Sequence, residues 1–173
     1  MSKKLLLLPV LLLSALLLAS CGGDDENGGD NEGGAALSTE AYAEQVSDEM
    51  TDFEQEFRDL GAAAANPENA DEYVAAVQDI QDRLTETAEN LDGIEPPEEA
   101  ADIHARLTKV FRDLEAAYGE IIEAVQSENR KEIANAVANL QTTTEAFQAE
   151  VTEIATESKD AGFPIEHLAP TSE

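Results

Sequence analysis

The 173-residue sequence has a single cysteine, no tryptophan and only ten basic residues. One cysteine excludes an intramolecular disulfide and a multi-cysteine metal site, so the fold must depend on packing. The ten lysines and arginines stand against 38 aspartates and glutamates, which gives a formal net charge of −28. Such an acidic surface repels the phosphates of nucleic acids and of anionic lipids, so neither is expected as the main partner.

Residue patterns that carry chemistry are scarce as well. His104 and His167 are the only histidines, and they do not form the Glu-x-x-His pairs that hold metals in helical bundles. No serine stands in a Gly-x-Ser-x-Gly turn, and the glycine-rich stretch carries no phosphate-binding motif. We therefore expect no metal, no cofactor and no enzymatic activity. His104 is instead expected to be partly buried, bonded to a neighbour or to the Pro96-Pro97 turn.

The one long apolar run lies at the N-terminus, where Lys3 and Lys4 precede a leucine-rich segment over residues 5–18. A charged start, a short apolar core and small residues before a cleavage point define a secretory signal. The run is shorter than the ~20 apolar residues that a membrane-spanning helix needs. Residues 1–20 are therefore predicted to be an export signal that is removed.

The segment ends in Leu18-Ala19-Ser20-Cys21, which resembles the bacterial lipoprotein signal. This resemblance implies that lipoprotein-processing enzymes recognise Leu18, Ala19 and Ser20, attach diacylglycerol to the Cys21 thiol and cut just before it. The covalent lipid would then anchor the mature chain to the outer face of a bacterial cell membrane, because two or three acyl chains hold far better than one. The alternatives are an ordinary signal peptide with an incidental cysteine, and an uncleaved anchor.

Residues 21–36 are predicted to be a disordered spacer behind this cysteine. Residues 22–34 hold six of the ten glycines and five acids, with no apolar side chain. Such a segment buries too little surface to offset its ordering entropy. A glycine-rich coil of this length has an average reach of roughly 20 Å, so it would separate the lipid from the rest of the chain.

Residues 37–162 have a different character, with only four glycines and much alanine, glutamate, glutamine and leucine. Apolar residues recur there in steps of three and four, the pattern of a helix seam, and no stretch alternates like a strand. Four such stretches occur. Their seams are Tyr42, Val46, Met50, Phe53, Phe57, Leu60 and Ala64; Tyr73, Val77, Ile80, Leu84, Ala88 and Leu91; Ile103, Leu107, Val110, Leu114, Ala117, Ile121 and Val125; and Ile133, Val137, Leu140, Thr144, Phe147, Val151 and Ile154.

The links between these stretches are short, which makes neighbouring helices antiparallel. The sequence therefore predicts an all-α, up-down-up-down four-helix bundle over residues 37–162. In the tail over residues 163–173, Phe163 and Ile165 are expected to fold back onto the bundle end. Gly93 is expected in a left-handed position that ends the second helix, and Gly162 is expected to close the fourth. The alternatives are a three-helix bundle with a free arm and an oligomer that exchanges helices.

Five acids of the first stretch recur at every fourth residue and are predicted to form an acidic ridge on the face away from its seam: Glu40, Glu44, Asp48, Asp52 and Glu56. Like charges at this spacing repel, and three acid–base pairs at the same spacing offset the repulsion: Glu54 with Arg58, Asp79 with Arg83 and Asp102 with Arg106. The ridge has three interpretations: a solvated surface that suits a salty habitat, a weak divalent-cation site, or a dock for a basic partner. A compact calcium loop is absent from the sequence, so any cation site would be weak.

Pro96-Pro97 followed by His104 and Leu107 is similar to a pattern in small, uncharacterised helical lipoproteins of Gram-positive bacteria, especially actinobacteria. The resemblance implies a bundle ectodomain without a particular activity. We therefore predict a cell-envelope lipoprotein whose acidic bundle is a non-catalytic binding or structural module, with an envelope protein, a small molecule or a cation as its partner. The alternative is a lipoprotein that binds a solute or a divalent cation in a bundle pocket or on the acidic ridge.

Overall fold

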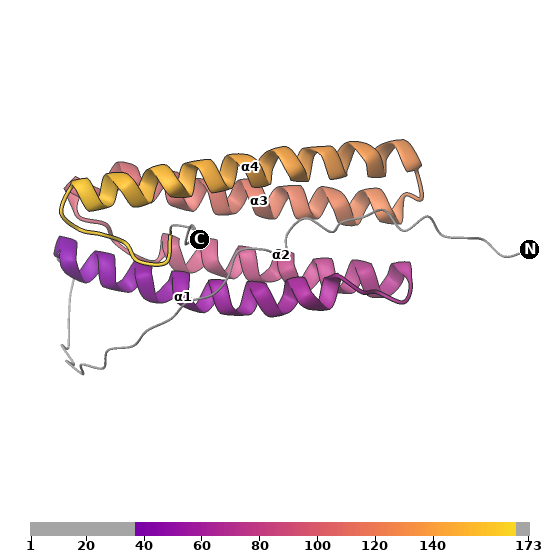
Figure 1. Ribbon diagram of the computed structural model, residues 1–173, viewed down its shortest axis with the longest axis horizontal. Helices are drawn as coiled ribbons and strands as arrows, with labels where there is room; N and C mark the ends of the chain where they lie inside the picture. Colours follow the sequence, from indigo (N-terminus) through magenta and orange to yellow (C-terminus); the bar gives the residue numbers. More distant parts are fainter. Residues whose placement is uncertain (1–36, 169–173) are drawn as a thin grey trace, which may run out of the picture.

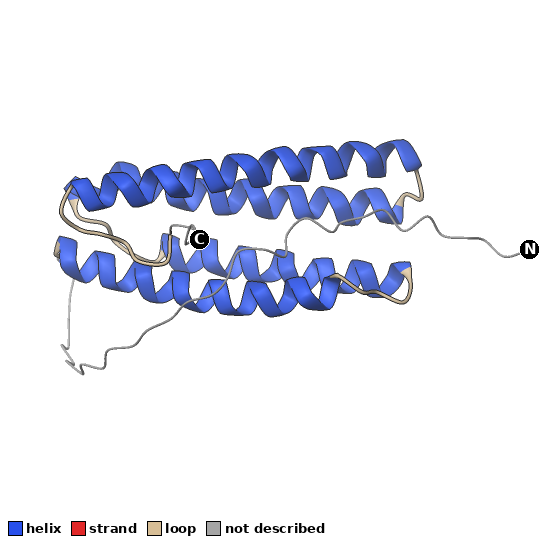
Figure 2. Cartoon of the chain, viewed as in Figure 1, coloured by secondary structure: helices blue, strands red, loops and turns tan. Residues whose placement is uncertain are grey.

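The computed structural model describes residues 37–168, and most of these are helical (Figures 1 and 2). The predicted signal, the whole predicted spacer with Cys21, and residues 169–173 lie outside the described residues. Strands are absent from residues 37–168, which confirms the all-α prediction. The elements are α1 (Thr39–Ala64), α2 (Ala70–Asp92), the short 3₁₀ helix η1 (Glu98–Ala100), α3 (Ala101–Gln126) and α4 (Arg130–Asp160).

Polar side chains start three of the four long helices. Ser38, Asn69 and Asn129 each stand in extended geometry and accept a hydrogen bond from a backbone N–H two or three residues further on. These bonds satisfy N–H groups that have no partner inside the first turn. α3 starts differently, because η1 leads directly into it after Pro97.

The two glycines expected to end helices behave differently. Gly162 follows the end of α4, as expected, and its φ of +88° places it in the left-handed region. Gly93 has a φ of −75°, so the left-handed prediction was wrong there. Its N–H donates to the carbonyls of Glu89 and Asn90 at 3.1 Å, and the N–H of Ile94 donates to Leu91. The helical turn therefore runs on through Gly93, and no left-handed residue is needed.

The four helices run up and down as two hairpins, α1–α2 and α3–α4, which stack on one another (Figure 1). Backbones approach closely between α1 and α2, between α2 and α3, and between α3 and α4. No comparable approach joins α1 to α4 within residues 37–168. The four-helix bundle is thus confirmed, with an open fourth side that we call the α1–α4 seam.

Every apolar residue of the four predicted seams is buried or packs partly buried against one continuous core. Burial of an aliphatic or aromatic side chain contributes about 1.5–3 kcal/mol, so these rows supply most of the driving force. Burial is uneven along α1 and α4. The seam residues of α1 are buried up to Met50, and those of α4 from Val151 onward. The remainder of each row is only partly buried.

The chain after α4 turns back into the α1–α4 seam, and we call residues 161–168 the strap (Figure 1). Phe163, Ile165 and Leu168 are buried there, so the prediction for the first two is confirmed. The Phe163 ring lies edge-on to Tyr42 of α1, with centroids 6.2 Å apart. The backbone N–H of Glu166 donates to Ser47 Oγ at 2.9 Å. The strap therefore substitutes for direct α1–α4 packing at one end of the bundle.

Candidate binding surfaces

The five acids of the acidic ridge are all exposed on α1. Each step of four residues turns about 40° beyond a full helical turn, so the row winds around α1. Its last member, Glu56, reaches α2, where its Oε2 lies 2.8 Å from Arg83 Nε. The prediction of one ridge facing away from the packed side was therefore wrong at this end. Glu40, Glu44, Asp48 and Asp52 make no ion pair with any described residue.

Arg83 of α2 is the centre of a first cluster of carboxylates. Only 7 % of its side chain is exposed, and its guanidinium lies 3.4 Å from Glu49 and 2.8 Å from Glu56, both on α1. Glu86 of α2 is 3.3 Å away. The predicted pairing with Asp79 was wrong, because Arg83 points toward α1 and meets acids from that helix. The cluster fastens α1 to α2.

Glu49 is the least exposed acid of this cluster, with 14 % of its side chain exposed. Burial raises its pKa; a hydrogen bond from Asn90 and the charge of Arg83 act in the opposite direction. The Asn90 amide donates to Glu49 Oε2 at 3.0 Å. The carboxylate therefore has fixed partners on α2, which suits a tie between helices better than a free acid or base.

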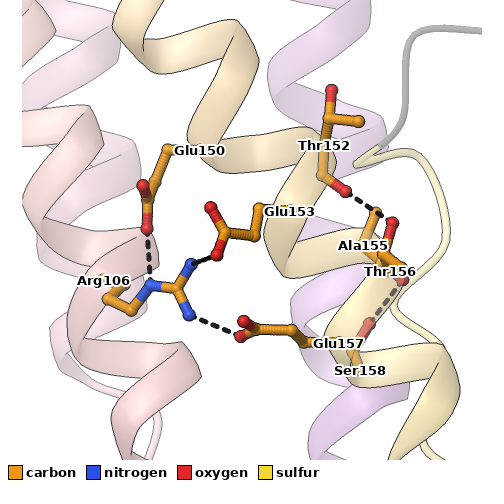
Figure 3. A network of polar contacts seen from close by, with 8 residues as sticks. All are labelled: Arg106, Glu150, Thr152, Glu153, Ala155, Thr156, Glu157 and Ser158. Carbon is orange, nitrogen blue, oxygen red and sulfur yellow. Dashed lines mark hydrogen bonds and ion pairs between the residues drawn. The ribbon is translucent and has the colours of Figure 1, made fainter.

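Arg106 of α3 forms a second cluster with three acids of α4 (Figure 3). Its guanidinium contacts Glu150 and Glu157 and lies 3.5 Å from Glu153. The hydrogen bond that Arg106 donates to Glu150 is the largest cause of a raised Arg106 pKa. The predicted pairing with Asp102 was wrong, because the three acids lie on one face of the neighbouring helix. This cluster fastens α3 to α4.

Both clusters are organised around an arginine, and neither forms an empty ligand site. Among residues 37–168, histidine and carboxylate side chains do not gather into a group that could hold a metal ion. Acid–base spacing within one helix does not predict these clusters, because their partners lie mostly on a neighbouring helix. The sequence does place Glu150, Glu153 and Glu157 on one face of α4, but it does not show that Arg106 of α3 is their partner.

His104 is 9 % exposed at the end of the bundle where the strap lies. Its Nδ1 is 3.3 Å from the hydroxyl of Tyr42, and the two ring centroids are 5.7 Å apart. The expectation that His104 is buried and bonded to a neighbour is confirmed, with α1 supplying that neighbour. Burial lowers the pKa of His104 and raises that of Tyr42. The histidine therefore joins α3 to α1 as a neutral side chain at neutral pH.

The bundle interior between α2 and α3 is filled by side chains at Gly119. A Cβ at this position would lie 2.9 Å from the amide nitrogen of Gln81, which donates to Glu115 at 2.8 Å. Gly119 therefore makes room for a side chain of the protein itself. A recess between α3 and α4, lined by Val110, Asp113, Thr143, Ala146 and Phe147, encloses about 180 Å³ including open solvent. Small-molecule pockets typically start at about 300 Å³.

None of the helices within residues 37–168 combines the length and apolar character needed to cross a bilayer. No family model, curated protein or solved structure matches this chain.

Proposed function

We propose that the protein is a lipid-anchored protein of the bacterial cell envelope, with its helical bundle displayed outside the membrane as a non-catalytic binding or structural module. The observation that carries the proposal is the order Leu18-Ala19-Ser20-Cys21 directly behind a charged, leucine-rich N-terminus. The only thiol of the chain then receives the lipid, and a fold without cysteines follows it.

The bundle suits display on a tether. Its long helices of 23 to 31 residues make it about 35–45 Å long, roughly twice the average reach of the preceding spacer. Its acidic surface is repelled by anionic lipid head groups, which holds the bundle off the membrane. The buried and half-buried arginines hold helices together through fixed acid partners, which favours a rigid module over a catalytic centre.

Lipid attachment is tested by metabolic labelling with a clickable fatty-acid analogue in a bacterial host. The wild-type chain should be labelled and should fractionate with membranes. The Cys21→Ala and Cys21→Ser variants should lose the label and accumulate as the uncut precursor, which is larger by the 20-residue signal. Equal labelling of all three would remove the premise of the proposal.

Cleavage and display are tested separately on the same cells. Mass spectrometry of the purified wild type should give an N-terminal peptide that begins at a lipid-modified Cys21. A protease added to intact cells, or to spheroplasts where an outer membrane is present, should degrade the bundle but spare a cytoplasmic reference protein. A bundle protected until the cells are lysed would contradict display outside the membrane.

A further inference from the structure

The strap fills only one half of the α1–α4 seam. Its last described residue is Leu168, and the apolar residues further along the seam are only partly buried. Phe111 of α3 forms the floor between the two walls, with its ring edge-on to Phe53 of α1 at 4.9 Å and to Phe147 of α4 at 5.2 Å. We call this half the open seam. Its partly buried members are Phe53, Phe57 and Leu60 of α1 and Ile133, Val137, Leu140 and Phe147 of α4.

The helix surface beside the open seam is close to neutral. Residues 57–66 of the chain carry one arginine and one aspartate, and residues 129–149 carry two basic and two acidic residues. Residues 40–56, by contrast, carry seven acids and no base. The centres of protein interfaces are depleted of charge in the same way. In a chain of net charge −28, a second acidic molecule therefore meets little repulsion on this face.

Arg130 and Lys131 stand out at one end of this face. They are exposed in the first turn of α4, where the helix dipole disfavours positive charge. Neither side chain forms an ion pair with any residue in the part of the chain that the structure describes, although acids outnumber bases almost four to one. The helix dipole disfavours these two basic residues, and no acid of the described bundle pairs with them. We therefore infer that an acid of another molecule is their partner.

The sequence of α4 places such an acid at the matching position. At about 100° per residue, Arg130, Ala134, Ala138, Gln141 and Glu145 share the outer side of α4 next to the open seam. All five are exposed. Arg130 and Glu145 are equally far from the midpoint between Val137 and Ala138, and so are Ala134 and Gln141. An antiparallel copy of α4 would therefore set opposite charges against each other at both ends.

We propose that the open seam is the docking surface for a second copy of this chain, with two α4 helices antiparallel about a two-fold axis next to Ala138. Arg130 of each copy then pairs with Glu145 of the other, and Ala134 faces Gln141. A two-fold contact uses the same face twice, so neutral surface meets neutral surface. α1 leaves room beside it, because a Cβ at Gly61 would meet no atom within 4 Å.

The size of the face sets the strength of the pair. The neutral part of α4 is about 28 Å long, and two helices side by side are about 20 Å wide. Each copy then contributes roughly 550 Å², below the ~800 Å² per partner of a standard stable interface. The pair is therefore weak in free solution, and confinement of tethered copies to a membrane strengthens it through a higher effective concentration.

Residues 35–173 are suited to the test, because every described core contact lies between residues 37 and 168, and circular dichroism verifies the fold of each variant. Sedimentation equilibrium from micromolar to millimolar protein should show a monomer–dimer equilibrium that strengthens in molar NaCl. Ala138→Glu keeps an exposed helix former in place and should weaken the dimer about tenfold or more, equivalent to ~1.4 kcal/mol. Gln78→Glu adds the same charge on an exposed position of α2 and should leave the dimer within twofold of wild type.

A charge exchange tests the register. Glu145→Lys and Arg130→Glu should each weaken the dimer, and the double variant should restore it, because the pair is re-formed with its charges swapped. Glu123→Lys, at an exposed position of α3, makes the same change of net charge as Glu145→Lys and should not weaken association. Two weakened single variants without recovery in the double variant would overturn the antiparallel α4 pairing.

A monomer at millimolar protein in molar salt would overturn the proposal, and so would a dimer unaffected by Ala138→Glu. A fluorescent fatty acid serves as the probe for a different occupant. Uptake of that probe by a wild-type monomer would assign the open seam to an acyl chain and would likewise overturn self-docking. The experiment uses unlipidated protein, so its outcome is independent of the lipid on Cys21.

Discussion

At the scale of single residues, His104 and Tyr42 form a polar pair inside the core. Both side chains are buried, and they join α3 to α1 beneath the strap. The groups that face His104 are the Tyr42 hydroxyl from α1 and Asp92 and the Leu91 backbone from α2, with Phe163 of the strap against Tyr42. A neutral imidazole suits this site, because burial disfavours its charged form more than Asp92 favours it.

The first prediction concerns pH. The pKa of His104 is lowered in the folded chain by burial, so the unfolded chain binds a proton more readily. The stabilisation is therefore complete above the unfolded pKa of about 6.5 and is lost as pH falls below it. Urea unfolding between neutral pH and pH ~5.5 should show a steeper loss of stability for the wild type than for His104→Asn, whose amide does not titrate. Parallel pH profiles would contradict this role.

The second prediction concerns Thr108, which is 4 % exposed on α3. Its hydroxyl has no hydrogen-bond partner among the described protein groups. Thr108→Val keeps the shape and removes the unpaired hydroxyl, so the free energy of unfolding should rise by about 1 kcal/mol. Thr144→Val is the matched control, because that hydroxyl donates to the Leu140 carbonyl at 2.8 Å and should bring no gain. A loss of stability in Thr108→Val would show that its hydroxyl is satisfied.

At the scale of elements, the strap closes a bundle whose first and last helices stay apart. Its apolar side chains fill the space that α1–α4 packing fills in a closed bundle. Its backbone donates hydrogen bonds to both α1 and α4. Ser47 of α1 accepts the Glu166 N–H at 2.9 Å, and Ser158 of α4 accepts the Ile165 N–H at 3.4 Å. Three residues of the strap, Phe163, Ile165 and Leu168, thus contribute to the core, although the composition of this segment is that of a tail.

The third prediction tests this role of the strap. Phe163 is 2 % exposed and packs on Tyr42, so Phe163→Ala should lower the free energy of unfolding by about 3–4 kcal/mol in urea. Glu166→Gln changes an exposed side chain whose backbone makes the strap contact, and it should stay within about 0.5 kcal/mol of wild type. A Phe163→Ala effect as small as that of the control would mean that the strap is not part of the folded core.

The periodicity of apolar residues was enough to predict the helices, their order and their buried faces. The caps at Ser38, Asn69 and Asn129 are local features, because each side chain accepts from an N–H two or three residues further on. The polar contacts between helices could not be predicted from the sequence. Arg83 and Arg106 were assigned acids of their own helices, whereas packing brings two acids of α1 to Arg83 and three acids of α4 to Arg106. The open α1–α4 seam was missed for the same reason, since one helix's apolar row does not show whether a neighbour or the strap covers it.

At the scale of the whole molecule, negative charge opposes the compact state. The acidic ridge includes four consecutive pairs of like charge at the spacing of four, each costing about 0.2–0.5 kcal/mol in an isolated helix. Arg83 neutralises only the end of the ridge at Glu56. The repulsion is greatest in dilute buffer, because salt shortens the range of exposed charges to about 3 Å at molar concentration.

The fourth prediction is that salt raises the stability of residues 35–173. Relief of about 1–2 kcal/mol along the acidic ridge should raise the Tm by about 3–10 °C between dilute buffer and molar NaCl, measured by calorimetry at neutral pH. Asp48→Asn combined with Asp52→Asn removes the middle of the ridge, so that variant should start with a higher Tm and respond less to NaCl.

Calcium chloride at matched ionic strength separates screening from binding, because screening gives equal shifts for both salts. A larger shift with calcium that disappears in the double variant would assign the ridge to divalent cations, whereas an unchanged Tm in molar NaCl would remove charge repulsion as a determinant of stability.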